Sequence, residues 1–150
     1  MARMEIDFPE DLFGGLLNQN TEELCREMVD AAVPIMEESL KKEVQSVIGH
    51  GGDSELVKSI KGSKAKVSKN NAVISFVGPK GNSRHHYFGG AKKDRKYKVS
   101  NALKAIWLNY GRRGQPARPF INRATMNAEK KVLAKMQEVY DRRTGGADGR

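Results

Sequence analysis

Two long stretches of the chain place apolar residues at helical spacing. In the first, from Thr21 to Val47, apolar side chains return every three to five residues, so they share one side of a helix and acidic residues lie opposite. Asn20 followed by Glu23 has the form of a capping box, in which each side chain satisfies a backbone N–H at a helix start. We therefore expect a helix from about Thr21 that ends at Gly49 to Gly52. Its buried side is predicted to hold Leu24, Met28, Ala32, Ile35, Leu40, Val44 and Val47.

Pro34 lies inside this stretch. Proline has no N–H to donate to the carbonyl four residues earlier, here that of Asp30, and its ring crowds that carbonyl. We therefore predict a kink or a break in the helix at Pro34.

The second stretch covers the end of the chain. Pro119 is predicted at the first helical position, where its missing N–H costs nothing. The tail from Thr144 is poor in apolar residues, so we expect one domain over residues 1–143 and a disordered tail over 144–150. The predicted apolar stripe of the last helix comprises Phe120, Ile121, Ala124, Ala128, Val132, Met136, Val139 and Tyr140.

A shorter helix is predicted between these two. Ser100 is placed to cap its start and Gly111 to end it. Apolar residues at i, i+3, i+4 and i+7 predict one core-facing side, with the only tryptophan of the chain in the shared core. These residues are Leu103, Ile106, Trp107 and Tyr110.

Alternating residues predict a small sheet. Lys64–Lys69 and Ala72–Gly78 flank Asn70-Asn71, a dipeptide that tolerates the positive φ of a tight hairpin turn. Residues 52–61 predict either a turn of helix or the approach to a strand. At the start of the chain, Met4 to Phe8 alternate, and Pro9 then favours a turn of helix through Leu17.

The polar stretch from Pro79 to Val99 is expected to be a loop of about twenty residues, a length typical of functional loops or of loops that order on binding. Basic residues run from Lys92 to Lys98, interleaved with Tyr97 and preceded by Tyr87 and Phe88. Such a loop resembles a nucleic-acid surface, but it also suits an acidic protein partner.

Charge divides the chain in two. Residues 1–43 have a balance of −7 and residues 44–150 a balance of +16. The two parts can complement one another between copies of the chain, or they can simply be two solvated faces. No apolar run is long enough for a membrane span, and the acidic N-terminus differs from a signal peptide.

Nothing in the sequence predicts catalysis, a metal or a cofactor. The adjacent His85 and His86 do not share a helix face and have no carboxylate or thiol beside them. Cys25, the only cysteine, has no candidate base at a recognisable spacing, and it suits a small core residue. A hydrolase that uses His85 or His86 stays the weakest alternative.

The segment from Ala105 to Ala124 has the most distinctive pattern. An apolar helix ends in Asn109-Tyr110-Gly111, a basic spacer covers residues 112–116, and Ala117-Arg118-Pro119-Phe120 leads into the last helix. In this pattern the chain resembles the tail-completion or head-tail joining proteins of long-tailed bacteriophages (siphophage type), also described as minor tail or neck proteins. Leu56 to Ile60 matches a Leu-x-x-Ser-Ile element of that family. The chain departs from the family pattern at Asn109, where an acidic residue is common, and in the length of the loop 82–99.

The resemblance implies an α+β fold, with a small, mainly antiparallel sheet packed against a long N-terminal and a long C-terminal helix. It also implies a structural virion protein without cofactor, assembled in the host cytoplasm, that forms a ring, by expectation a hexamer, in the phage neck. Its partners would be further copies, the connector or stopper protein, the tail terminator or tail tube, and DNA that passes without specific binding. Within the motif, Trp107, Tyr110, Gly111, Pro119 and Phe120 are expected to be structural, with Phe120 against Trp107 or Tyr110.

For such a protein we expect contacts between copies at three places. The first is the acidic face of the first helix, with Glu22, Glu23, Glu37 and Glu38. The second is the loop from His85 to Lys98, with His85, His86, Tyr87, Lys92, Lys93 and Arg95. The third is the basic turn with Arg112, Arg113 and Arg118, whose charges sit where a helix N-terminus disfavours them and so suggest an acidic partner. Alternatively these arginines are solvated at little cost, and a basic nucleic-acid-binding protein is the second interpretation of the chain.

Overall fold

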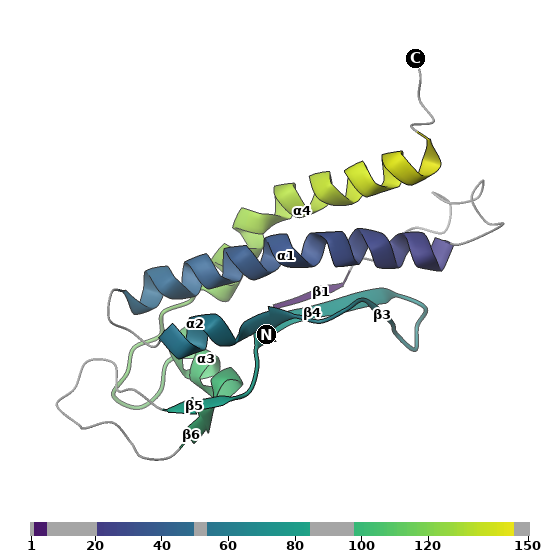
Figure 1. The fold of residues 1–150 in the computed structure, drawn as a ribbon. Helices are drawn as coiled ribbons and strands as arrows, with labels where there is room; N and C mark the ends of the chain where they lie inside the picture. Colours follow the sequence, from purple (N-terminus) through teal and green to yellow (C-terminus); the bar gives the residue numbers. More distant parts are fainter. Residues whose placement is uncertain (1, 6–20, 50–53, 85–97, 146–150) are drawn as a thin grey trace.

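The protein forms three layers, with the long helix α1 (Thr21–Ile48) between the helix α4 (Ile121–Thr144) and a small antiparallel sheet (Figure 1). The structure is a computed structural model and describes residues 2–5, 21–49, 54–84 and 98–145. The predicted α+β arrangement is confirmed. The remaining elements are β1 (Ala2–Glu5), α2 (Ser54–Ser59), β2 (Ile60–Gly62), β3 (Lys66–Val67), β4 (Val73–Pro79), β5 (Asn82–Arg84), β6 (Lys98–Ser100) and α3 (Asn101–Tyr110).

The strand β4 is the centre of the main sheet. Along one edge it pairs with β1, from Ala2 opposite Val77 to Glu5 opposite Ile74. Along the other edge it pairs first with β2 and then with β3. The predicted hairpin at Asn70-Asn71 is confirmed, and Asn71 has a φ of 59°.

One face of β4 is buried against α1. Val73, Ser75 and Val77 are buried, whereas Phe76 on the other face is 42% exposed. At Gly62 the sheet comes so close to α1 that a Cβ there would lie 2.0 Å from Cγ1 of Val33. A side chain at this position would therefore displace Val33.

The helix α1 begins at Thr21 as predicted, but it runs through Pro34 as a single helix. The predicted break was wrong, because the helix is buried on both sides of the proline: Ala32 is 0% and Met36 4% exposed. This packing outweighs a cost of about 3 kcal/mol for an interior proline. The proline itself is exposed, so its ring meets no neighbouring element.

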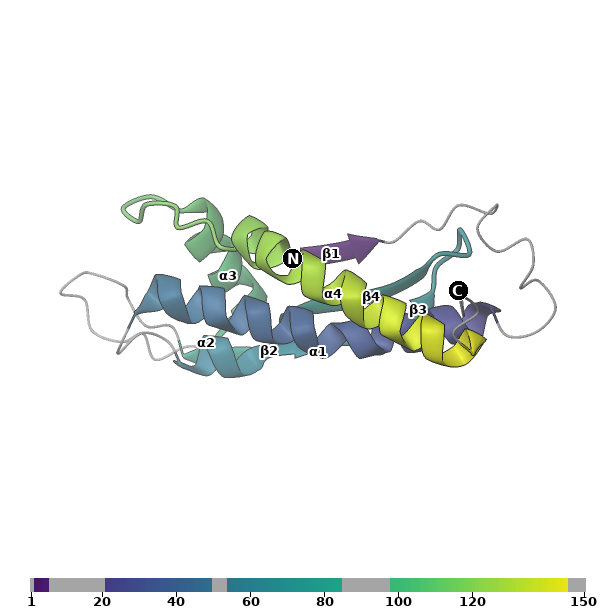
Figure 2. The ribbon, with the colours of Figure 1, turned by 90° about the horizontal axis from the view of Figure 1, so that it is seen from above.

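The helix α4 lies along α1 and crosses it obliquely (Figure 2). Its predicted stripe is confirmed: Phe120, Ala124, Ala128, Val132, Met136 and Val139 are buried, and Ile121 and Tyr140 pack against the core. The helix begins at Ile121, with Phe120 at the N-cap position, so the prediction of Pro119 at the first helical position was wrong. It also continues to Thr144, one residue beyond the predicted domain boundary.

The segments that connect these layers agree only partly with the predictions. Residues 54–62 contain both alternatives, since α2 leads directly into β2. The segment 79–99, expected to be a loop throughout, contains the paired strands β5 and β6. The first strand covers Ala2–Glu5, so it starts two residues before the predicted piece Met4–Phe8, and residues 6–8 lie outside the described residues. The predicted turn of helix after Pro9 lies outside the described residues.

The face of α3 predicted to enter the core is exposed instead. Leu103 is 39%, Ile106 45% and Tyr110 70% exposed, and Trp107 is only half-buried. The buried side of the helix consists of Asn101, Lys104, Ala105, Leu108 and Asn109. Three of these residues are polar, so the interactions of the polar side chains determine how α3 is turned.

Candidate interaction surface

Asn109 joins the end of α3 to the start of α4. Its carboxamide oxygen accepts hydrogen bonds from the backbone N–H groups of Phe120 (2.9 Å) and Ile121 (3.2 Å). The N-cap residue Phe120 makes no side-chain cap of its own. A side chain eleven residues earlier thus satisfies two orphan donors of the helix. The sequence pattern did not predict this role, because the capping residue lies eleven positions before the N-cap residue and belongs to the preceding helix.

Gly111 makes the tight return after α3. Its φ is 79°, and a Cβ at this position would lie 2.8 Å from the backbone nitrogen of Ala117 and 2.9 Å from the carbonyl oxygen of Gln115. The N–H of Arg118 then donates to the carbonyl oxygen of Leu108 (2.8 Å). The predicted structural role of Gly111 is therefore explained by both its dihedral angle and the close approach of the chain.

Arg112 belongs to the turn itself. Its guanidinium carbon lies 4.3 Å from the centroid of the Trp107 ring, and its Nε donates to Oε1 of Gln115 (3.1 Å). The backbones of Arg112 and Gln115 also exchange two hydrogen bonds. Trp107 therefore supports the basic turn at the surface, and the prediction that it lies in the shared core was wrong.

Arg118 interacts favourably with a helix end. One guanidinium nitrogen donates to the carbonyl oxygen of Val47 (3.2 Å), in the last turn of α1. Carbonyls at a helix C-terminus lack intrahelical partners and carry partial negative charge, so the arginine is stabilised there. We predicted that the charge of Arg118 is unfavourable at the N-terminus of α4. The interaction with the C-terminus of α1 offsets this cost for Arg118. Arg113, the third arginine of the turn, is exposed. No ion pair within the described residues involves it.

A buried polar cluster fixes the other end of α3 to the β5–β6 hairpin. Lys104 is 3% exposed, and its ammonium donates to Oγ of Ser83 (2.7 Å) and to the carbonyl oxygen of Arg84. Ser83 in turn donates to Oδ1 of Asn101, whose amide nitrogen donates to the carbonyl oxygen of Lys80 (2.9 Å). Buried polar groups need such partners, and together they hold the polar side of α3 inward.

The acidic face of α1 is largely engaged within the chain. Glu22 pairs with Arg26, and Glu23 lies 3.8 Å from Arg143. Glu37 accepts hydrogen bonds from Lys41 and from the N–H of Gly62 (2.9 Å). The bond from Lys41, above all, lowers the pKa of the Glu37 carboxyl despite its partial burial, which acts in the opposite direction. Glu38 is exposed and has no ion pair among the described residues.

The uncovered face of the sheet is basic. Lys61 lies opposite Gly78 and Lys66 opposite Ile74, so both lysines share the outward face with Phe76. Between Leu56 and Ala128 the sequence contains seventeen Lys and Arg, and Asp94 is its only acidic residue. The strands β2, β3 and β4 therefore contain no acidic residue.

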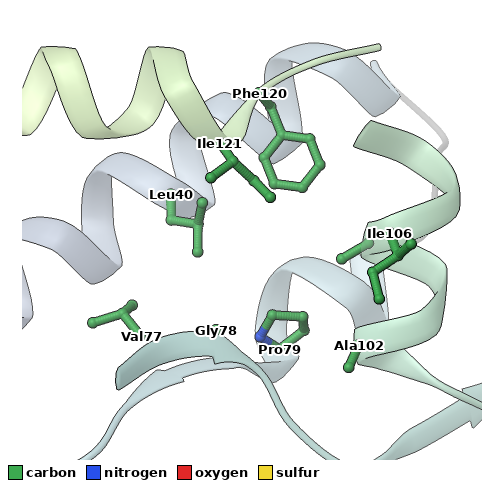
Figure 3. A pocket seen from close by; sticks show the side chains of 9 residues that line it. Leu40, Val77, Gly78, Pro79, Ala102, Ile106, Phe120 and Ile121 are labelled. Atoms are coloured by element: carbon green, nitrogen blue, oxygen red, sulfur yellow. The ribbon is translucent and has the colours of Figure 1, made fainter. Parts of the chain in front are cut away.

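A small apolar cavity lies beneath α3. Its volume is about 30 Å³, and Leu40, Pro79, Ile106 and Phe120 are among the side chains that line it (Figure 3). Phe120 is 2% exposed and points into this junction of α1, α3 and α4, whereas Tyr110, one of its two predicted partners, is largely solvent-exposed. Such a site offers a water molecule few polar partners.

The predicted contact residues His85, His86, Tyr87, Lys92, Lys93 and Arg95 lie outside the described residues. In the part of the chain that the structure describes, no three His, Cys, Asp or Glu side chains gather as a metal site would require. Cys25 is buried, as expected of a core residue, and burial raises the pKa of its thiol. No helix among the described residues is long and apolar enough to cross a membrane.

Comparisons of the chain with family models, with curated proteins and with solved structures found no match.

Proposed function

We propose that this protein is a structural component of the neck of a long-tailed bacteriophage, where copies of it form a ring that joins the tail to the head around the DNA channel. The connector or stopper protein and the tail terminator or tail tube are its proposed neighbours. This proposal extends the resemblance of the segment Ala105–Ala124 to the tail-completion family.

The observation that carries the proposal is the common role of the residues in that segment. Asn109 caps α4, Gly111 allows the tight return, and Phe120 anchors the start of α4 in the core. These contacts make the segment one folded unit at the junction of α3 and α4, and this supports the proposal.

A second argument is the distribution of charge and apolar surface. The strands β2 to β6 and α3 belong to a stretch that has only one acidic residue, and α3 exposes three large apolar side chains. Large apolar side chains exposed together on one helix face favour a protein partner. A structural protein in an assembly needs such surfaces.

Electron microscopy of the purified full-length protein, and of particles that contain it, tests the proposal. We expect rings with a central hole, and in particles a ring on the tail axis between head and tail. Particles in which labelled protein lies away from this axis would contradict the proposed function.

The alternative is a basic nucleic-acid-binding protein, which the outward sheet face with Lys61, Lys66 and Phe76 favours. It predicts submicromolar binding of DNA or RNA by the monomer, with log affinity falling linearly with log salt. The double variant Lys61→Gln/Lys66→Gln should then reduce the slope by about 2, since two phosphate contacts are lost. The control variant Lys130→Gln/Lys131→Gln on α4 should leave it unchanged. A monomer that binds no nucleic acid at low salt would exclude this alternative.

A further inference from the structure

Two helix faces of the protein expose large apolar side chains to solvent. The first, the α3 face, consists of Leu103, Ile106 and Tyr110. The second, the α4 face, contains Met126, which is 72% exposed, and Leu133, which is 54% exposed. In both faces the outer apolar residues are seven positions apart, so each pair spans two turns of helix. The two faces are therefore similar in length.

Each face has an exposed charge at its edge or centre, and the two charges are opposite. Arg113 follows Tyr110 by three residues, and Glu129 lies between Met126 and Leu133 on α4. No ion pair within the described residues involves either side chain. Glu129 is also the only acidic residue between Asp94 and Glu138. The one acidic residue of this basic stretch therefore lies on the apolar face of α4.

The two faces cannot meet within one chain. The helix α4 covers one side of α1, and α3 lies beside the sheet on the other side (Figure 1, Figure 2). The α4 face points away from α1, because the opposite side of α4, with Ala128 and Val132, is buried. A contact between the faces therefore requires two copies.

We propose that the α3 face of one copy packs against the α4 face of the next copy, with Arg113 paired to Glu129. This inference rests on the proposed homo-oligomer and names the surfaces that build it. The contact joins two different surfaces, so each copy offers one to the neighbour on either side. A heterologous contact of this kind generates a ring when the rotation between copies closes.

Two matched variants test the contact. Tyr110→Asp changes the α3 face and Met126→Asp the α4 face, at side chains that are 70% and 72% exposed. Each should weaken self-association of the full-length protein at least about ten-fold in sedimentation velocity, because a charge is placed within an apolar contact. Phe76→Asp, on the uncovered sheet face, is the control and should leave association unchanged. Circular dichroism checks that all three variants fold.

Mixing the two variants gives the sharper result. Tyr110→Asp keeps an intact α4 face, and Met126→Asp keeps an intact α3 face, so an equimolar mixture should form dimers and nothing larger. If the α3 face instead paired with itself, Met126→Asp would assemble like the wild type. That outcome would overturn the inference.

Charge reversal tests the ion pair separately. Arg113→Glu and Glu129→Arg should each weaken association, and the double variant should restore it. Lys69→Glu, at an exposed site on the hairpin, is the charge control. No recovery in the double variant would overturn the pairing.

The remaining outcomes separate this inference from the proposed function. Rings that are unaffected by both aspartate variants would refute the inference and leave the neck proposal in place. Open filaments that depend on both faces would support the inference and contradict the ring. A protein that stays monomeric at all concentrations would overturn the inference.

Discussion

The side chain of Asn109 caps the helix α4, whose N-cap residue Phe120 lies eleven residues later, through a 2.9 Å hydrogen bond from the backbone N–H of Phe120 to its carboxamide oxygen. Because the same oxygen also accepts from Ile121, one residue fixes the position of α3 relative to α4. The two ends of the turn between α3 and α4 are therefore joined directly by these hydrogen bonds.

Asn109→Ala should lower the free energy of unfolding by about 1–2 kcal/mol, since two buried donors lose their acceptor. For a protein of this size, this corresponds to a decrease in Tm of roughly 2–8 °C. Asn109→Asp is the matched control, because a carboxylate keeps the acceptor and is favoured at a helix N-terminus. Differential scanning calorimetry measures both. Equal losses in the two variants would contradict the capping role.

Gly111→Ala and Gly114→Ala compare two glycines with the same φ of 79°. An alanine is strained at both positions because φ is positive, and at Gly111 the ψ of 173° lies in a region that is essentially accessible to glycine only. At Gly111 the new Cβ also meets the backbone of Gln115 and Ala117, whereas at Gly114 nothing lies within 4 Å. Urea unfolding should therefore show a larger loss of stability for Gly111→Ala. Similar losses would mean that the backbone approach at Gly111 is relaxed at little cost.

Gly62→Ala should destabilise the protein because its Cβ would overlap with Val33. Overpacking of this kind typically costs about 1–3 kcal/mol. In the double variant Gly62→Ala/Val33→Ala the clash is removed, so the two substitutions should be less destabilising together than their sum. A double-mutant cycle by chemical denaturation measures this coupling. If the losses of stability in the two single variants were additive, the clash with Val33 would not be the cause of the destabilisation by Gly62→Ala.

The stability contributed by Glu37 should depend on acid pH. Its pKa is lowered in the folded state from the ordinary value of 4.5, so the ionised form is favoured by folding. This contribution is complete above pH 4.5 and is lost as the pH falls through the lowered pKa. The difference in unfolding free energy between the wild type and Glu37→Gln should therefore be larger at pH 7 than at pH 3. If this difference were independent of pH, the ionised carboxylate of Glu37 would contribute nothing to the stability of the fold.

The sequence predicted elements whose stabilising interactions are local. The start of α1 and the hairpin at Asn70-Asn71 follow from nearby residues, and the stripe of α4 follows from apolar residues at regular helical spacing. The break predicted at Pro34 was wrong for a related reason. The cost of a proline is local, whereas the packing that compensates it comes from α4 and the sheet.

The candidate site was harder to predict because it depends on how α3 is turned. Spacing alone indicated that Leu103, Ile106 and Tyr110 face the core, but Lys104 and Asn109 occupy the inward side. Their partners come from β5 and from the start of α4, far away in the sequence. The one available clue was that Asn101, Lys104, Ala105, Leu108 and Asn109 also share a helix face.

Ile106 has one side on the cavity beneath α3 and is 45% exposed on the other. A neighbour that covers this side chain also restrains the lining of the cavity, so binding and folding are linked through a single residue. By mass action, anything that binds only the folded chain raises its resistance to heat. The melting temperature of the protein should therefore rise with its own concentration, and Tyr110→Asp should remove that dependence.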